Sequence, residues 1–213
     1  MQDYFAEVPT YPPRLFRRRY QMRHSLFVKI VTDCEDASYY FKHHRSAAAI
    51  MGFSAYQKIS TAMRVLSYGI PAYYTDEYLH IGQDTTTESV RRFAKLVIWL
   101  YSVQYLWAPN EEDTKILMEM NEKRGWPEML GSLDCMHWRW KNYTKAWHEM
   151  YCSKSRDATI VLEAVASEDT WIWHAFFGLP GTLNDINVLN RSPLFKRLIS
   201  GDAPACNYKI MDN

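Results

Sequence analysis

Apolar residues recur every three or four positions between residues 53 and 107, and this spacing predicts a group of helices. The first helix presents on one face Phe53, Tyr56, Ile59, Met63 and Leu66. Its start, at residues 54–57, has the Ser-x-x-Gln pattern of a capping box, and a glycine at 69 with a proline at 71 ends it. A short segment at 75–81 has room for one or two helical turns before the next glycine.

A longer helix in the same region combines an apolar side with basic residues. Residues 85–88 read Thr-Thr-Thr-Glu, which predicts a second capping box at its start. The basic residues on its surface are Arg91, Arg92 and Lys95. A helix, a short helix, a turn and a longer basic helix make up a helix-turn-helix unit, which would bind DNA through these three residues. A three-helix bundle without DNA-binding geometry is the alternative.

The pattern changes from helical to β after Pro127. Asn110 is expected to cap a helix that has acids in its first turn and ends near Gly125. Three segments rich in β-branched and aromatic residues predict strands at 133–140, 159–166 and 170–177. A turn at 178–181 then leads into one helix over 183–198.

The composition supports a packed core, because 47% of the 213 residues are hydrophobic. The net charge of only +1 hides a basic block near the N-terminus, which includes Arg17, Arg18 and Arg19. Such a block contacts nucleic acid or acts as a nuclear-import signal, and a solvated basic arm is the alternative. We expect residues 1–23, rich in Pro, Tyr and Arg, to be extended, and residues 25–50 to form a weakly patterned helix.

Several classes of protein are disfavoured by what the sequence lacks. The four scattered cysteines make neither a disulfide framework nor a zinc-finger pattern, and they predict reduced thiols in a nuclear or cytosolic protein. No signal peptide is recognisable at the N-terminus. The longest apolar stretch, at 96–107, is about half of what a membrane helix needs. The sequence also lacks a Gly-rich phosphate loop and a G-x-S-x-G elbow.

Two aspartates are candidates for metal-dependent phosphoryl transfer. Asp134 lies in a β-type run and would share a strand face with Met136 and Trp138, where a charge is costly unless a metal or a partner satisfies it. An exposed aspartate at a strand end is the alternative. Asp185 precedes the last predicted helix, where it could instead cap that helix with Thr182, or Asn184 could be the cap.

Glu163 is a third acid of interest, because it lies in the middle of a predicted strand on the same face as Val161 and Val165. We expect it to be paired or at a sheet edge, and a role near bound metals stays open. His148 and His174 lack the partner spacing of a zinc site.

Three segments carry a family resemblance: GSLDCMHWRWKN, KSRDATIVLEAVAS and FFGLPGTLNDINVLNRSPLF. Together with the upstream helical region they resemble the PIF/Harbinger transposases of the plant transposon protein type, from about residue 40 onward. The resemblance implies an RNase H-like nuclease domain of the DDE superfamily that cleaves DNA with Mg²⁺ or Mn²⁺. Matched by position, Asp134 and Asp185 would be catalytic metal ligands. The resemblance further implies DNA and a Myb/SANT-like DNA-binding protein as partners, and a nuclear location.

The sequence therefore predicts an α+β protein with three parts. Residues 1–45 would be a basic arm with a weak helix, residues 46–125 a helical, helix-turn-helix-like region, and residues 126–213 an incomplete RNase H-like nuclease domain. The family's later strand aspartate and helix glutamate have no equivalent here, and Asp212 is a poor match. We expect a transposase-derived nuclease that is inactive as this chain. The alternative is a non-catalytic DNA-binding or protein-interaction module.

Overall fold

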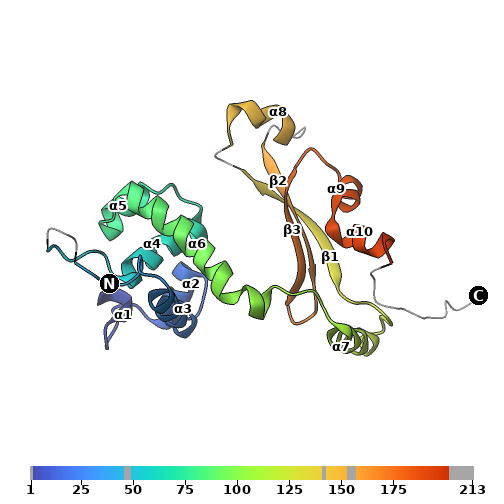
Figure 1. Ribbon diagram of the computed structural model, residues 1–213, viewed down its shortest axis with the longest axis horizontal. Coiled ribbons are helices and arrows are strands. Elements are labelled where there is room, and N and C mark those ends of the chain that lie inside the picture. The colour runs from blue at the N-terminus through green and yellow to red at the C-terminus, as the bar shows by residue number, and fades with distance from the viewer. Residues whose placement is uncertain (1, 46–48, 141–142, 153–156, 202–213) are drawn as a thin grey trace, which may run out of the picture. The chain divides into compact units, whose positions relative to one another are not determined.

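The computed structural model describes residues 2–45, 49–140, 143–152 and 157–201. It divides into two compact units, an N-terminal unit, Met1–Tyr105, and a C-terminal unit, Leu106–Asn213. The N-terminal unit is helical in its described part, and the C-terminal unit combines helices with an antiparallel sheet (Figure 1). The mixed helix and sheet content confirms the predicted α+β class. Asp212 lies outside the described residues.

The helices of the N-terminal unit are α1 (Gln2–Phe5), α2 (Pro13–Tyr20), α3 (His24–Ala37), α4 (Ala55–Tyr68), α5 (Tyr74–Leu79) and α6 (Gln83–Tyr105). The capping box predicted for α4 is confirmed. The Ser54 hydroxyl accepts a hydrogen bond from the Gln57 amide, and the Gln57 side chain accepts one from the Ser54 amide at 3.0 Å. Gly69 ends α4 in the left-handed conformation, with a φ of 60°.

The expectation that residues 1–23 are extended was wrong, because this segment contains α1 and α2. Pro13 occupies the first turn of α2, where its missing amide hydrogen costs no helical hydrogen bond. Phe16 and Tyr20 lie one turn apart and stack with ring centroids 4.3 Å apart, both almost fully buried. Burial of these two rings therefore holds a short helix in a segment whose prolines predict extended chain.

The capping box predicted at 85–88 was also wrong, because α6 begins two residues earlier, at Gln83. Thr86 lies inside the helix and is fully buried. Its hydroxyl is 2.7 Å from the hydroxyl of Thr75 on α5, and this bond ties the two helices together. The order of helix, short helix and longer helix in α4–α6 is as predicted.

An aromatic core fills the space between α1, α2, α3 and α4. Phe27 of α3 is fully buried at its centre, and its ring meets those of Phe5, Phe16 and Tyr20 at centroid distances of 5.4, 5.6 and 4.9 Å. Phe93 extends this core to α6. The unit is thus held together by aromatic contacts between segments far apart in sequence.

Acid is expected to weaken the link between α3 and α6. Lys29 donates to Asp33 at 2.5 Å and Tyr101 donates at 2.6 Å, and these two bonds hold the pKa of the Asp33 carboxyl below its usual value. A lowered pKa in the folded state contributes stability at neutral pH, and that contribution is lost as pH falls through the folded pKa. Asp33→Asn should therefore lower the melting temperature at neutral pH and flatten its fall below about pH 4, measured by circular dichroism. Asp36→Asn, exposed on the same helix, is the control; equal acid curves for the two variants would contradict the assignment.

The elements of the C-terminal unit are α7 (Glu111–Glu122), β1 (Ser132–Arg139), the 3₁₀ helix η1 (Lys145–Trp147), α8 (His148–Tyr151), β2 (Thr159–Ala166), β3 (Ile172–Pro180), α9 (Asp185–Arg191) and α10 (Pro193–Ile199). The strands pair antiparallel in the order β1-β2-β3. Asn110 caps α7 as predicted, accepting from the Asp113 amide at 2.8 Å.

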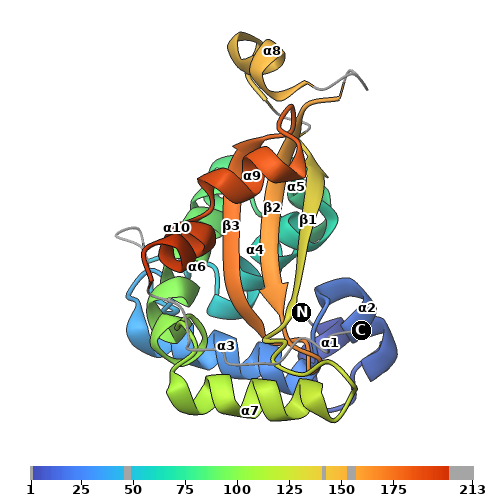
Figure 2. The same cartoon turned by 90° about the vertical axis from the view of Figure 1, so that its right-hand side faces the viewer.

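Two details of this unit differ from the sequence prediction. β3 continues through Pro180, so the turn predicted at 178–181 comes later; Gly181 donates to the Thr159 carbonyl at 2.8 Å. The single helix predicted over 183–198 is two helices, α9 and α10, which cross one face of the sheet (Figure 2). They separate at Ser192, whose backbone is extended because Pro193 follows it. None of the described helices combines the length and apolar character that crossing a bilayer requires.

Candidate functional site

Asp134 lies near the beginning of β1, at one edge of the sheet that the described residues form. Its carboxylate is exposed, and Oδ1 accepts a hydrogen bond from the Cys135 amide at 2.8 Å. The expectation of a buried strand face was wrong, since Met136 and Trp138 on the same face are each 53% exposed. Asp134 is instead the exposed aspartate near a strand end that was the alternative prediction.

Asp185 is the first residue of α9 and is not the residue that caps it. Asn184 has that role, because its side-chain oxygen accepts from the Asn187 amide at 2.9 Å. The Thr182 hydroxyl donates instead to the Met150 carbonyl at 3.0 Å, so the alternative capping box does not form. The exposed Asp185 carboxylate accepts no hydrogen bond from the described residues, which leaves its oxygens available to a ligand.

The half-buried thiol of Cys135 lies near several acids. Burial raises the pKa of this thiol, and the negative charges of Asp185, Glu163 and Asp134 raise it further. The effect of a charge on a pKa weakens with distance, so the carboxylates that raise the pKa of Cys135 lie in the same part of the fold. Asp134 and Asp185 are fifty-one positions apart in sequence. β1 and the start of α9 thus bring them into one acidic region.

Glu163 lies beneath this region on the central strand β2, where it pairs with Cys135 of β1. It is fully buried, and Oε1 accepts from the Ser192 hydroxyl at 2.5 Å and lies 3.2 Å from Nε2 of His174. The 3.2 Å contact between Oε1 and Nε2 lacks hydrogen-bond geometry. Among the described residues, neither His174 Nε2 nor the second carboxylate oxygen, Glu163 Oε2, has a hydrogen-bond partner. The expectation that Glu163 is paired is confirmed. Ser192, which no sequence motif indicated, is its principal partner.

The acids present suit a hard divalent cation better than a zinc ion. Among the described residues, no three His, Cys, Asp or Glu side chains come together as a ready metal-binding group. Asp134 and Asp185 supply two accessible carboxylates, and Mg²⁺ in phosphate-processing sites is commonly held by one or two carboxylates plus substrate oxygens and water. The described residues of this region therefore offer two exposed carboxylates and no complete set of metal ligands.

The basic residues singled out on α6 are partly neutralised by one acid. Glu88 lies 2.6 Å from Arg92 and 3.6 Å from Arg91, and these two arginines with Lys95 lower its pKa. The Arg92 guanidinium also stacks over Tyr40, with 4.6 Å to the ring centroid. The side chains of Arg91, Arg92 and Lys95 are exposed, but the two arginines already make ionic or ring contacts within the N-terminal unit.

The three arginines singled out on α2 differ from one another. Arg19 is half-buried, stacks 4.5 Å from the Tyr11 ring centroid and contacts the Tyr4 hydroxyl. Arg17 and Arg18 are exposed on the opposite side of the helix from Phe16 and Tyr20. Arg19 thus has a structural role, whereas Arg17 and Arg18 are available to a ligand.

Comparison with known protein families gives two matches. A family model described as plant transposon protein matches residues 103–213, more than half of the chain, and this segment includes both Asp134 and Asp185. A model described as a domain of unknown function (DUF8418) matches residues 1–35. No individual curated protein and no solved structure matches the chain at a significant level.

Proposed function

This chain belongs to the plant transposon protein family, and on that premise we propose that its C-terminal unit derives from the metal-dependent nuclease of a PIF/Harbinger-type transposase. The substrate is the DNA phosphodiester bond, and Asp134 and Asp185 hold Mg²⁺ or Mn²⁺. The observation that supports the proposal is the match of residues 103–213 to the plant transposon protein model, because this segment contains both exposed aspartates, Asp134 and Asp185.

The surroundings of both carboxylates are compatible with this role. The hydrogen bond from the Cys135 amide orients Asp134, and capping by Asn184 leaves Asp185 free to face a ligand. A bound divalent ion would supply a positive charge that stabilises the attacking and leaving oxygens of an in-line displacement. The buried Glu163 fixes α9 to the sheet through Ser192, and so positions Asp185.

The same origin accounts for the fold of both units and implies a cellular location and a partner. The β1-β2-β3 sheet crossed by α9 and α10 is compatible with the beginning of an RNase H-like domain, and α4–α6 with a helix-turn-helix unit. A nuclear location and a Myb/SANT-like DNA-binding partner follow from the same proposal.

Calorimetric titration with Mn²⁺ tests the metal site. Asp134→Asn keeps an acceptor for the Cys135 amide but removes the charge, so we expect it to weaken Mn²⁺ binding by at least about tenfold. Glu168→Gln, which removes an exposed charge in the β2–β3 turn, is the matched control and should bind as the wild type does. Coinciding curves for wild type and Asp134→Asn would refute the metal site.

Nicking of supercoiled plasmid in Mn²⁺ separates the proposed nuclease from a binding module. Nicking by the wild type that Asp134→Asn abolishes would show a working nuclease and would overturn the expectation that this chain is inactive. If the wild type binds Mn²⁺ yet leaves the plasmid intact, the chain is instead a non-catalytic module that retains the metal site, which is the competing function.

A further inference from the structure

The exposed face of α2 carries a concentrated positive charge. Arg14, Arg17 and Arg18 follow one another at helical spacings of three and four residues, so their side chains share one face. Together with Arg23 they line a pocket of about 810 Å³ between α2 and the start of α3. Among the residues that the structure describes, none of these four guanidinium groups forms an ion pair. We call this hollow the arginine pocket.

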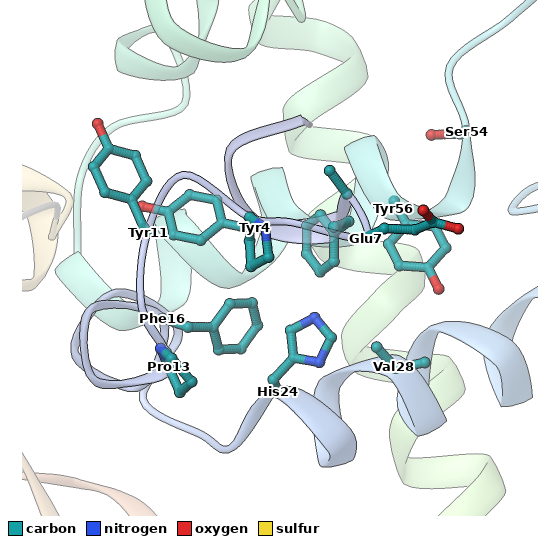
Figure 3. A pocket seen from close by; sticks show the side chains of 12 residues that line it. Tyr4, Glu7, Tyr11, Pro13, Phe16, His24, Val28, Ser54 and Tyr56 are labelled. Atoms are coloured by element: carbon teal, nitrogen blue, oxygen red, sulfur yellow. The ribbon is translucent and has the colours of Figure 1, made fainter.

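A second pocket, of about 780 Å³, adjoins the first and is aromatic. Its walls include the rings of Tyr4, Phe5, Tyr11, Phe16 and Tyr56. Figure 3 shows the labelled rings of Tyr4, Tyr11, Phe16 and Tyr56 around the space, with the His24 imidazole beside Phe16. We call this hollow the aromatic pocket. Pro13 and His24 line both pockets, so one extended ligand could occupy both.

The two pockets differ in the chemistry that they favour. The aromatic pocket is lined by one acid, Glu7, and by partly exposed rings, which favour an uncharged planar group with a donor at its edge; these rings are Phe5, Tyr11 and Tyr56. The arginine pocket contains cations and no acid, which favours phosphate groups, because guanidinium binds phosphate oxygens in pairs. A nucleotide joins these two kinds of group at short range.

We propose that these two pockets form a binding site for single-stranded nucleic acid. Backbone phosphates occupy the arginine pocket, and one unstacked base enters the aromatic pocket, where the Glu7 carboxylate accepts from an exocyclic amine of the base. The strand is single because bases in a duplex are stacked on one another and present no free face. The site lies in the N-terminal unit and needs no metal ion, so it goes beyond the proposed nuclease.

A phosphotyrosine peptide is the main rival ligand, since it too joins a ring to a phosphate. A single phosphate monoester, however, accounts for only part of the arginine pocket, where four guanidinium groups gather. Successive phosphates of a strand would account for all of them.

The test is fluorescence anisotropy of the full chain with a labelled single-stranded dodecamer of mixed sequence, in EDTA so that metal binding cannot contribute. The wild type should bind this strand at least about tenfold more tightly than the duplex of the same sequence. Arg14→Ala/Arg18→Ala should weaken binding at least about tenfold and reduce the slope of log affinity against log salt by about 1.4, which is two lost phosphate contacts. Alanine preserves the helix propensity of α2. Lys42→Ala/Arg45→Ala removes as much charge from outside both pockets and should change affinity less than about threefold.

The aromatic pocket is tested separately with Tyr56→Leu and His24→Ala. Each should weaken single-strand binding by about fivefold or more while leaving the salt slope unchanged, because stacking contributes no released ions. His24 is exposed, so its variant tests the pocket even where Tyr56→Leu unfolds.

Three outcomes would overturn the site. The first is equal binding of strand and duplex. The second is a greater loss from Arg91→Ala/Lys95→Ala on α6 than from Arg14→Ala/Arg18→Ala. The third is tighter binding of a phosphotyrosine peptide than of the strand. All three leave the Mn²⁺ titration of Asp134→Asn unaffected, so the two proposals fail independently.

Discussion

Phe27→Ala is expected to destabilise the N-terminal unit by about 3–5 kcal/mol, the usual range for truncating a fully buried phenylalanine. The loss combines the transfer of the ring with the cavity left between Phe5, Phe16 and Tyr20, and those three rings come from segments that cannot all move inward. Since whole domains are stable by about 5–15 kcal/mol, this variant should bring the unit close to unfolding at room temperature.

Far-UV circular dichroism during urea titration measures this effect, because the described part of the N-terminal unit is helical. Tryptophan fluorescence reports mainly the C-terminal unit, because Trp99 is the only tryptophan before residue 106, and it therefore complements the circular dichroism signal. Leu26→Ala is the matched control, for this neighbouring side chain is 48% exposed and its loss should cost under about 1 kcal/mol. Equal losses for the two variants would show that Phe27 does not hold the core.

Glu163→Ala is expected to destabilise the C-terminal unit by about 3 kcal/mol. The substitution leaves the buried Ser192 hydroxyl without its acceptor at 2.5 Å and the His174 imidazole without its neighbouring carboxylate. It also opens a cavity under α9 and α10. Tryptophan fluorescence in urea reports this unit, which contains the remaining tryptophans of the chain.

Glu163→Gln provides the control for this prediction, because its carbonyl oxygen still accepts from Ser192 and its volume is nearly unchanged. We expect it to lose no more than about half as much stability. A Gln variant as unstable as the Ala variant would mean that the charge beside His174, rather than the Ser192 hydrogen bond, holds the helices on the sheet.

The elements that sequence predicted well are those whose signals are local. The α4 and α7 boundaries followed from Ser54 and Asn110, whose side chains bond to amides three residues away. The α2 helix was missed because its stability comes from rings that it buries against distant segments. A usable signal was nevertheless present, in Pro13 at a first-turn position followed by Phe16 and Tyr20 four residues apart.

The candidate site was only partly predictable, for a related reason. Asp134 and Asp185 were found by motif, but their surroundings were not, since exposure depends on which strand becomes an edge. Local sequence also left Asn184 and Asp185 as equal candidates for the cap, and only backbone geometry separates them. The Ser192–Glu163 bond joins residues 29 positions apart with no motif between them, so no local pattern could indicate it.

The break between α9 and α10 puts Ser192, which bonds to Glu163, at the C-terminal end of α9. α9 is attached to the sheet at its C-terminal end, through Ser192, and along its length by the buried Val188, whereas Asp185 is at its exposed N-terminal end. Asp185 thus lies at the end of α9 that is farther from the Ser192 attachment. Substitution of Ser192 is therefore expected to displace Asp185 relative to Asp134, while both residues and the Cys135–Asp134 hydrogen bond are kept.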